Sequence, residues 1–120
     1  MDDKVNLREK LALFDEPFSP RIVGTMNDYK IQLGKLDGDF VWHSHPETDD
    51  FFLVLEGEVE IELRDRTVTL REGELFVVPA GVQHRPRSSG KASILLIEPK
   101  GTVNTGDAPP GELTAPERSI

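Results

Sequence analysis

The sequence predicts an all-β protein, and two observations support this prediction. From about Ile22 to Ile97, apolar and polar residues alternate with a period of two, as expected for strands that bury one face. Short turn signals rich in Gly, Asn, Asp, Ser and Pro separate these runs. Many short strands at regular spacing favour a barrel or sandwich, and 120 residues suffice for one core.

A short helix is expected first, over residues 6–14. Asn6 can cap its start, and Glu9 follows three positions later, as in a capping box. One apolar stripe runs along it, formed by Leu7, Leu11 and Phe14. Pro17 prevents the helix from continuing. We therefore assign residues 1–20 to an N-terminal helix and arm.

The barrel is expected over residues 21–100. Alternation is clearest in three runs, residues 29–34, 58–64 and 67–71. Three other segments are apolar on both faces, residues 51–55, 75–78 and 94–97. A small barrel has one interior, so something must cover the second apolar face. We predict that a second copy covers it in a homodimer, with the N-terminal helix as the alternative.

Residues 101–120 are expected to form an extended C-terminal arm or a disordered end. The segment is rich in Gly, Pro, Thr and Glu, and Pro109 and Pro110 exclude a strand interior or a helix. Its ordering would depend on docking to a neighbour.

Composition excludes several function classes. The net charge is −8, with 22 acidic and 14 basic residues, which disfavours nucleic acid and anionic membranes as partners. Without cysteine the chain has no disulfide, thiolate ligand or cysteine nucleophile. No run is long enough to cross a membrane, and the first residues lack the apolar stretch of a secretory signal. We expect a cytoplasmic protein.

Three histidines and one aspartate suggest a metal site. His43 and His45 are two residues apart, so in a strand both side chains point to one face. Asp50 opens the next predicted strand, and His84 follows a Pro-Ala-Gly turn. Such nitrogen and oxygen ligands suit a divalent transition metal that keeps an open position.

Around these residues the chain resembles a small single-domain bacterial cupin of the type-2, mannose-6-phosphate-isomerase-like class. The first cupin motif, Gly-x5-His-x-His-x3–4-Glu-x6-Gly, is matched by Gly38, His43, His45, Asp50 and Gly57. The second motif, Gly-x5-Pro-x-Gly-x2-His-x3-Asn, is matched by Gly73, Pro79, Gly81 and His84. The departures are a shorter spacing after Gly38, Asp50 in place of Glu, and Ser88 in place of Asn.

The resemblance implies a double-stranded β-helix, a jelly-roll barrel that holds Fe, Mn, Zn or Ni. The implied ligands are His43, His45, His84 and Asp50. Since Asp is one methylene shorter than Glu, Asp50 coordinates the metal either directly or through water. Glu47 and Asp49 are possible substitutes for it.

The resemblance leaves two main functions open. One is a metal-dependent enzyme for a small organic molecule, of isomerase, lyase or dioxygenase type. The other is a non-catalytic module that binds a metal or a small ligand, and a structural protein with vestigial histidines is a third possibility. Strand parity predicts an apolar cavity, with Val41, Phe52, Val54 and Pro86 inward and Phe40 and Trp42 outward. Tyr29 is expected either at the cavity mouth or in the core, and no separate general base is evident.

Overall fold

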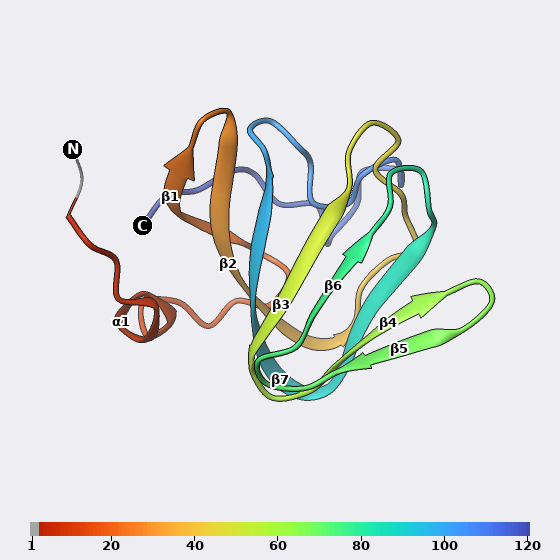
Figure 1. Ribbon diagram of the computed structural model, residues 1–120, viewed down its shortest axis with the longest axis horizontal. Coiled ribbons are helices and arrows are strands. Elements are labelled where there is room, and N and C mark those ends of the chain that lie inside the picture. Colours follow the sequence, from red (N-terminus) through yellow and green to blue (C-terminus); the bar gives the residue numbers. More distant parts are fainter. Residues whose placement is uncertain (1–2) are drawn as a thin grey trace.

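The computed structural model describes residues 3–120, which form an antiparallel β-fold with one short helix, as the sequence predicts (Figure 1). The elements are α1 (Leu7–Leu11), β1 (Arg21–Met26), β2 (Tyr29–Asp39), β3 (Asp50–Glu56), β4 (Val59–Leu63), β5 (Thr67–Leu70), β6 (Leu75–Val78) and β7 (His84–Pro99).

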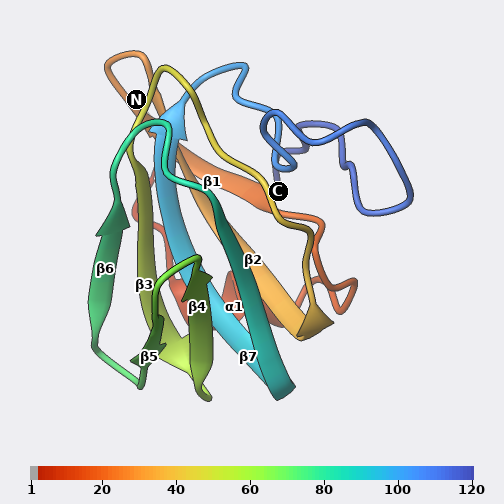
Figure 2. The ribbon, with the colours of Figure 1, turned by 90° about the vertical axis from the view of Figure 1, so that its right-hand side faces the viewer.

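The long strand β7 connects the two halves of the barrel. One edge of β7 pairs with β2 along almost its whole length. The other edge pairs with β4 through residues 84–87 and with β3 through residues 93–97. β1, β6 and β5 extend these pairings at the edges of β2, β3 and β4. The strands therefore curve around one interior, which Figure 2 shows from the side.

Alternate side chains from the strands fill this interior. Val54, Val59 and Ile61 are fully buried at 0% exposure. The remaining core residues are also aliphatic or aromatic: Leu36, Phe52, Leu70, Val78, Ala92, Ile94 and Leu96. Burial of this apolar surface is the main term that stabilises the fold.

The N-terminal helix begins as predicted and ends early. The Asn6 side chain accepts a hydrogen bond from the Glu9 backbone N–H at 3.0 Å, which caps the first turn. The helix ends at Leu11 rather than at residue 14. Leu11 and Phe14 are nevertheless buried, and they pack against Leu33 on the outer face of the sheet.

The helix covers only one corner of that outer face. Beyond it, aligned apolar side chains cross β2, β7, β3 and β6. We call this set the outer apolar patch; it comprises Ile31, Phe51, Leu53, Leu75, Val77 and Ile97. Leu75 is 56% exposed and Val77 is 40% exposed, so this part of the face lacks cover within the described residues of one chain.

At the start of strand β2 the polar side chains, rather than the apolar ones that alternate with them, point into the barrel. Tyr29 is 44% exposed on the outside, so it lies neither in the core nor in the cavity. Lys30 and Gln32 are instead buried, at 2% and 3% exposure. Gln32 Nε2 donates a hydrogen bond to the Glu98 carboxylate on β7 at 2.7 Å, and Lys30 Nζ forms an ion pair with the same carboxylate at 3.5 Å. These polar partners explain why charged and amide groups can occupy interior positions.

The segment after β7 folds back across one end of the barrel (Figure 2). It consists of turns and returns to β1, where Ser119 forms a bridge with Ile22. Among residues 3–120 there is no helix of sufficient length and apolarity to span a membrane.

Candidate metal centre

Regular strands position two of the four predicted ligands. Asp50 is the first residue of β3 and His84 the first residue of β7. His43 and His45 lie in the irregular segment between β2 and β3, which bonds to the sheet through a bridge between His43 and His84 and through the Phe40 N–H, which donates to the Pro86 carbonyl. The expected strand around the His-x-His pair is therefore reduced to a single bridge.

The fold brings all four side chains together. One donor atom from each of His43, His45, Asp50 and His84 lies within 4.8 Å of the others, and all four residues are buried. The Asp50 carboxylate lies between two of the rings. Its Oδ2 is 2.9 Å from His84 Nε2 and 3.3 Å from His45 Nε2.

The surroundings of His84 place both of its ring nitrogens beside hydrogen-bond acceptors. Its Nδ1 lies 2.9 Å from the carbonyl oxygen of Val82, which can only accept a hydrogen bond, so Nδ1 carries a proton. Its Nε2 lies 2.9 Å from the Asp50 carboxylate, which also only accepts. Either a second proton or a metal cation must therefore lie between His84 Nε2 and Asp50.

The protonation states of His43 and Asp50 favour the binding of a cation. Burial, assisted by the nearby His84, lowers the pKa of His43 to about 4. Neutral His43 donates from Nδ1 to the Val41 carbonyl at 2.9 Å, which leaves a lone pair on Nε2 for the cluster. Burial alone would raise the pKa of Asp50, but hydrogen bonds from His45 and His84 outweigh it and lower the pKa to about 2. Asp50 is thus ionised at neutral pH.

The pKa of His45 moves the other way. Burial opposes its protonation, but the hydrogen bond to Asp50 and the charge of that carboxylate raise its pKa above the ordinary value. A metal ion in contact with Asp50 would replace this proton as the positive partner.

The donor set fits a divalent metal. Donors held about 2.1 Å from an ion lie about 3 Å from their neighbours, close to the 2.9 and 3.3 Å separations around Asp50. Neither alternative carboxylate joins the cluster. Glu47 is exposed, and Asp49 accepts a hydrogen bond from the Ala80 backbone N–H at 2.9 Å, which supports the turn before β7.

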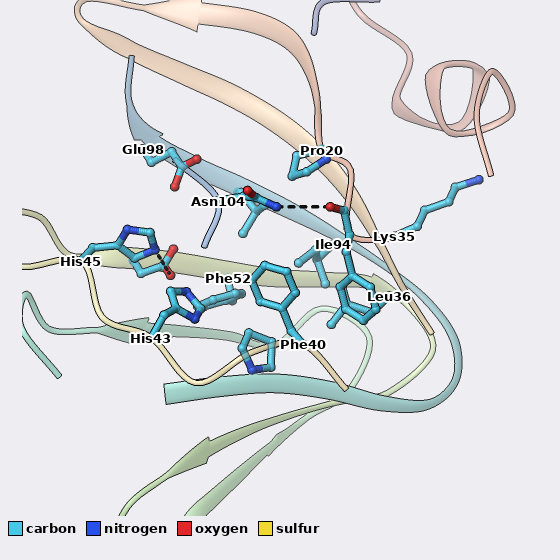
Figure 3. Close-up of a pocket in the computed structure, with 14 residues that line it drawn as sticks. Pro20, Lys35, Leu36, Phe40, His43, His45, Phe52, Ile94, Glu98 and Asn104 are labelled. Carbon is cyan, nitrogen blue, oxygen red and sulfur yellow. Dashed lines mark hydrogen bonds and ion pairs between the residues drawn. The ribbon is translucent and has the colours of Figure 1, made fainter. Parts of the chain in front are cut away.

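An apolar cavity opens beside the cluster (Figure 3). Its lining combines three residues of the cluster, mainly apolar side chains and a few polar groups: His43, His45, Asp50, Phe18, Pro20, Lys35, Leu36, Phe40, Phe52, Pro86, Ile94, Leu96, Glu98 and Asn104. Phe18 and Phe40 are stacked, with ring centroids 5.1 Å apart. A flat apolar wall thus lies near the donor atoms.

Strand parity predicted part of this lining. Phe52 and Pro86 line the cavity as expected, whereas Val41 and Val54 do not, and Val54 lies in the buried core. Phe40 was expected outside and lines the cavity as well. The reason is that β2 ends at Asp39, so strict alternation no longer applies to Phe40 and Val41.

The cavity also contains a carboxyl group that the sequence analysis missed. Glu98 is 6% exposed and lines the cavity from the end of β7. Burial raises its pKa, and the Asp50 charge adds to the effect. Its position directly opposite Lys30 on β2 could have been inferred only from the strand register.

Comparisons with known proteins agree with this geometry. A family model described as a cupin domain matches residues 31–98. A solved cupin-2 domain-containing protein from Shewanella frigidimarina is 44% identical, covers 80% of this chain and 94% of its own, and superposes with a TM-score of 0.79.

Two sequence relatives are an uncharacterized protein and a dioxygenase. The uncharacterized protein YdbB of Bacillus subtilis is 35% identical over 79 residues, 65% of this chain and 70% of its own. The 3-hydroxyanthranilate 3,4-dioxygenase of Brucella anthropi is 35% identical over 74 residues, 56% of this chain. The match spans only 40% of the length of that dioxygenase.

Proposed function

The chain belongs to the cupin family, and from this premise we propose that it is a metal-dependent enzyme that acts on a small organic molecule inside its barrel. The observation that carries the proposal is the cluster of four buried donors, in which a proton or a metal cation must lie between His84 Nε2 and Asp50. His43, His45, Asp50 and His84 would hold the metal. Fe, Mn, Zn and Ni all accept such nitrogen and oxygen ligands.

Among the possible reactions we favour oxygen-dependent cleavage of a small aromatic compound. The relatedness to an aromatic-ring dioxygenase supports this class, and so does the aromatic wall of Phe18 and Phe40. When bound, an iron ion would supply a position for substrate and dioxygen. Isomerase and lyase chemistry are the other reactions that such a site supports.

We propose that Glu98 orients the substrate. Its Oε1 accepts a hydrogen bond from Gln32 and forms an ion pair with Lys30. Among the described residues, none donates a hydrogen bond to Oε2. A hydroxyl or amino group of a bound substrate can donate to Oε2 while its ring packs against the apolar wall. The Glu98 carboxyl group would thus fix which edge of the substrate faces the metal ligands.

Metal content tests the first part of the proposal. We expect plasma mass spectrometry of untagged protein, prepared without chelators, to find about one transition metal per chain. The His45→Ala/His84→Ala double variant should lose it. Folded wild-type protein that stays metal-free after incubation with Fe²⁺, Mn²⁺, Zn²⁺ and Ni²⁺ would refute the proposal.

Oxygen uptake tests the reaction. Protein loaded with Fe²⁺ should consume one O₂ per molecule of substrate from a panel of catechols, aminophenols and hydroquinones. Glu98→Gln should raise KM, and Glu112→Gln, an exposed acid of the C-terminal segment, serves as the matched control. Metal binding without turnover of any compound would favour the non-catalytic binding module instead.

We also propose that the outer apolar patch joins two copies in a homodimer. Its residues are uncharged, so two chains of net charge −8 can meet there without placing like charges in contact. Within residues 3–120, strand β6 pairs only with β3, which leaves its other edge open beside the patch. Light scattering should give the mass of a dimer, and Leu75→Lys/Val77→Lys should give a folded monomer. A monomeric wild-type protein would contradict the assignment.

A further inference from the structure

The C-terminal segment contacts the residue between two of the proposed ligands. Asp107 accepts two hydrogen bonds from Ser44, one from its backbone N–H to Oδ1 at 2.6 Å and one from its hydroxyl to Oδ2 at 2.7 Å. The Asp107 backbone N–H donates to the Ser44 carbonyl at 3.0 Å. Three hydrogen bonds therefore join a single pair of residues that are 63 positions apart.

The neighbouring Gly106 brings the two backbones into direct contact. A Cβ atom at Gly106 would clash with the Ser44 carbonyl oxygen and would lie 3.0 Å from Cδ2 of the His43 ring. Gly106 also has a φ of +54°, a conformation that favours glycine. The segment thus packs against the His43 ring as well as against Ser44.

Contacts on both sides of Asp107 fix this segment on the barrel. Before it, Asn104 Nδ2 donates to the Phe18 carbonyl at 3.2 Å, as Figure 3 shows. After it, Glu117 accepts from the buried Lys30 ammonium at 2.9 Å. The Ile120 backbone N–H donates to the Ile22 carbonyl at 3.0 Å. Asp107 therefore reaches Ser44 from a supported backbone.

Ser44 itself lies outside the regular strands, so the sheet ladder does not hold it directly. Between β2 and β3 the backbone bonds to the sheet at the bridge of His43 with His84 and at Phe40, whose N–H donates to the Pro86 carbonyl at 2.9 Å. The His45 carbonyl accepts a hydrogen bond from the Gly81 N–H at 3.0 Å. Ser44 is 5% exposed, so without Asp107 its N–H and hydroxyl would be buried without these partners.

We propose that Asp107 is a positioning residue for the metal centre, which holds Ser44 and thereby fixes His43 and His45 in the geometry that binds the ion. This inference rests on the proposed metal site. Asp107 does not belong to the donor cluster, so its effect passes through the backbone of Ser44. Supporting groups of this kind typically contribute 10–100-fold to metal affinity.

Cobalt binding to the full-length chain provides the test. Co²⁺ reports affinity through competition with a chelator, and its visible absorption spectrum reports ligand geometry. We expect Asp107→Ala to weaken Co²⁺ binding about 10–100-fold and to change the spectrum. Ser44→Ala should have a smaller effect because it removes only the hydroxyl bond, and Glu112→Gln should have none.

Two conservative variants separate positioning from folding. Asp107→Asn keeps the size of the side chain but offers one acceptor oxygen in place of two, so it should fall between wild type and Asp107→Ala. Asp107→Glu keeps both oxygens and should recover part of the affinity. If Asp107→Ala fails to fold, the Asn variant and Ser44→Ala still decide the question.

Unchanged Co²⁺ affinity and spectrum in folded Asp107→Asn and Asp107→Ala would overturn the proposal, even if these variants melt at lower temperature. A wild-type chain that binds no Co²⁺ would instead refute the metal site itself. The two failures are therefore distinguishable.

Discussion

The two halves of the candidate metal centre are built differently. Asp50 and His84 begin regular strands, and the pairing of β3 and β7 with their neighbours fixes their backbones. His43 and His45 lie in an irregular segment, and the C-terminal segment contacts that segment through Asp107. Asp50 and His84 are thus held by the hydrogen bonding of the sheet itself, whereas the segment of His43 and His45 also contacts a distant part of the chain.

Removal of a strand-borne ligand should have the largest effect. Asp50→Ala takes away the carboxylate that contacts both His45 and His84, so we expect metal affinity to fall by more than the roughly 100-fold typical of a lost supporting contact. Isothermal titration with Zn²⁺ measures the change. Glu47→Ala, in a neighbouring exposed carboxylate, is the control. Equal losses in both variants would contradict the assignment of Asp50.

A substitution in the supporting segment should have an intermediate effect. Gly106→Ala places a methyl group against the Ser44 carbonyl and forces alanine into a left-handed conformation. We expect the free energy of unfolding of metal-free protein to fall by about 1–3 kcal/mol, measured in urea. Gly111→Ala adds the same methyl group where no atom lies within 4 Å, and it should change stability little. Similar losses in both would show that the close contact with Ser44 is unimportant.

The smallest expected effect is a difference in pKa between His43 and His45, the two histidines of the irregular segment. In metal-free protein, nitrogen NMR of the imidazole rings should show His43 titrating near pH 4 and His45 above its ordinary value. Since folding lowers the pKa of His43, the contribution of His43 to stability is present above pH 6.5 and is lost as the pH falls toward 4. Because folding raises the pKa of His45, its contribution to stability is present below its unfolded pKa and is lost as the pH rises through its folded pKa. A His43 pKa near 6.5 would contradict its burial as a neutral ligand.

Local sequence patterns were sufficient to predict the fold and to select the cluster. The alternation of apolar residues and the spacing of His43, His45, Asp50 and His84 depend on neighbours along the chain. They therefore remain visible without coordinates. The joint match to two cupin motifs then specified the barrel, which the structure and the family model confirm.

Other features depend on contacts between distant residues, and the sequence did not reveal them. Lys30 and Gln32 face the interior because Glu98 lies next to them on β7, against the usual preference for apolar residues inside. Asp107 lies in a segment that composition assigned to an arm or a disordered end. Its partner Ser44 has no pattern in the sequence that would single it out.

The contact between Asp107 and Ser44 also has a consequence for the order of events during protein synthesis. All four proposed ligands are synthesised by the time residue 84 is added, whereas Asp107 follows 23 residues later (107 − 84). At roughly 5–20 residues per second, this leaves an interval of about 1 to 5 s. On the proposed role of Asp107, a nascent chain in that interval would have every donor but would lack the Asp107 contact and, until Pro99 is added, a complete β7, so it would not yet bind metal at full strength.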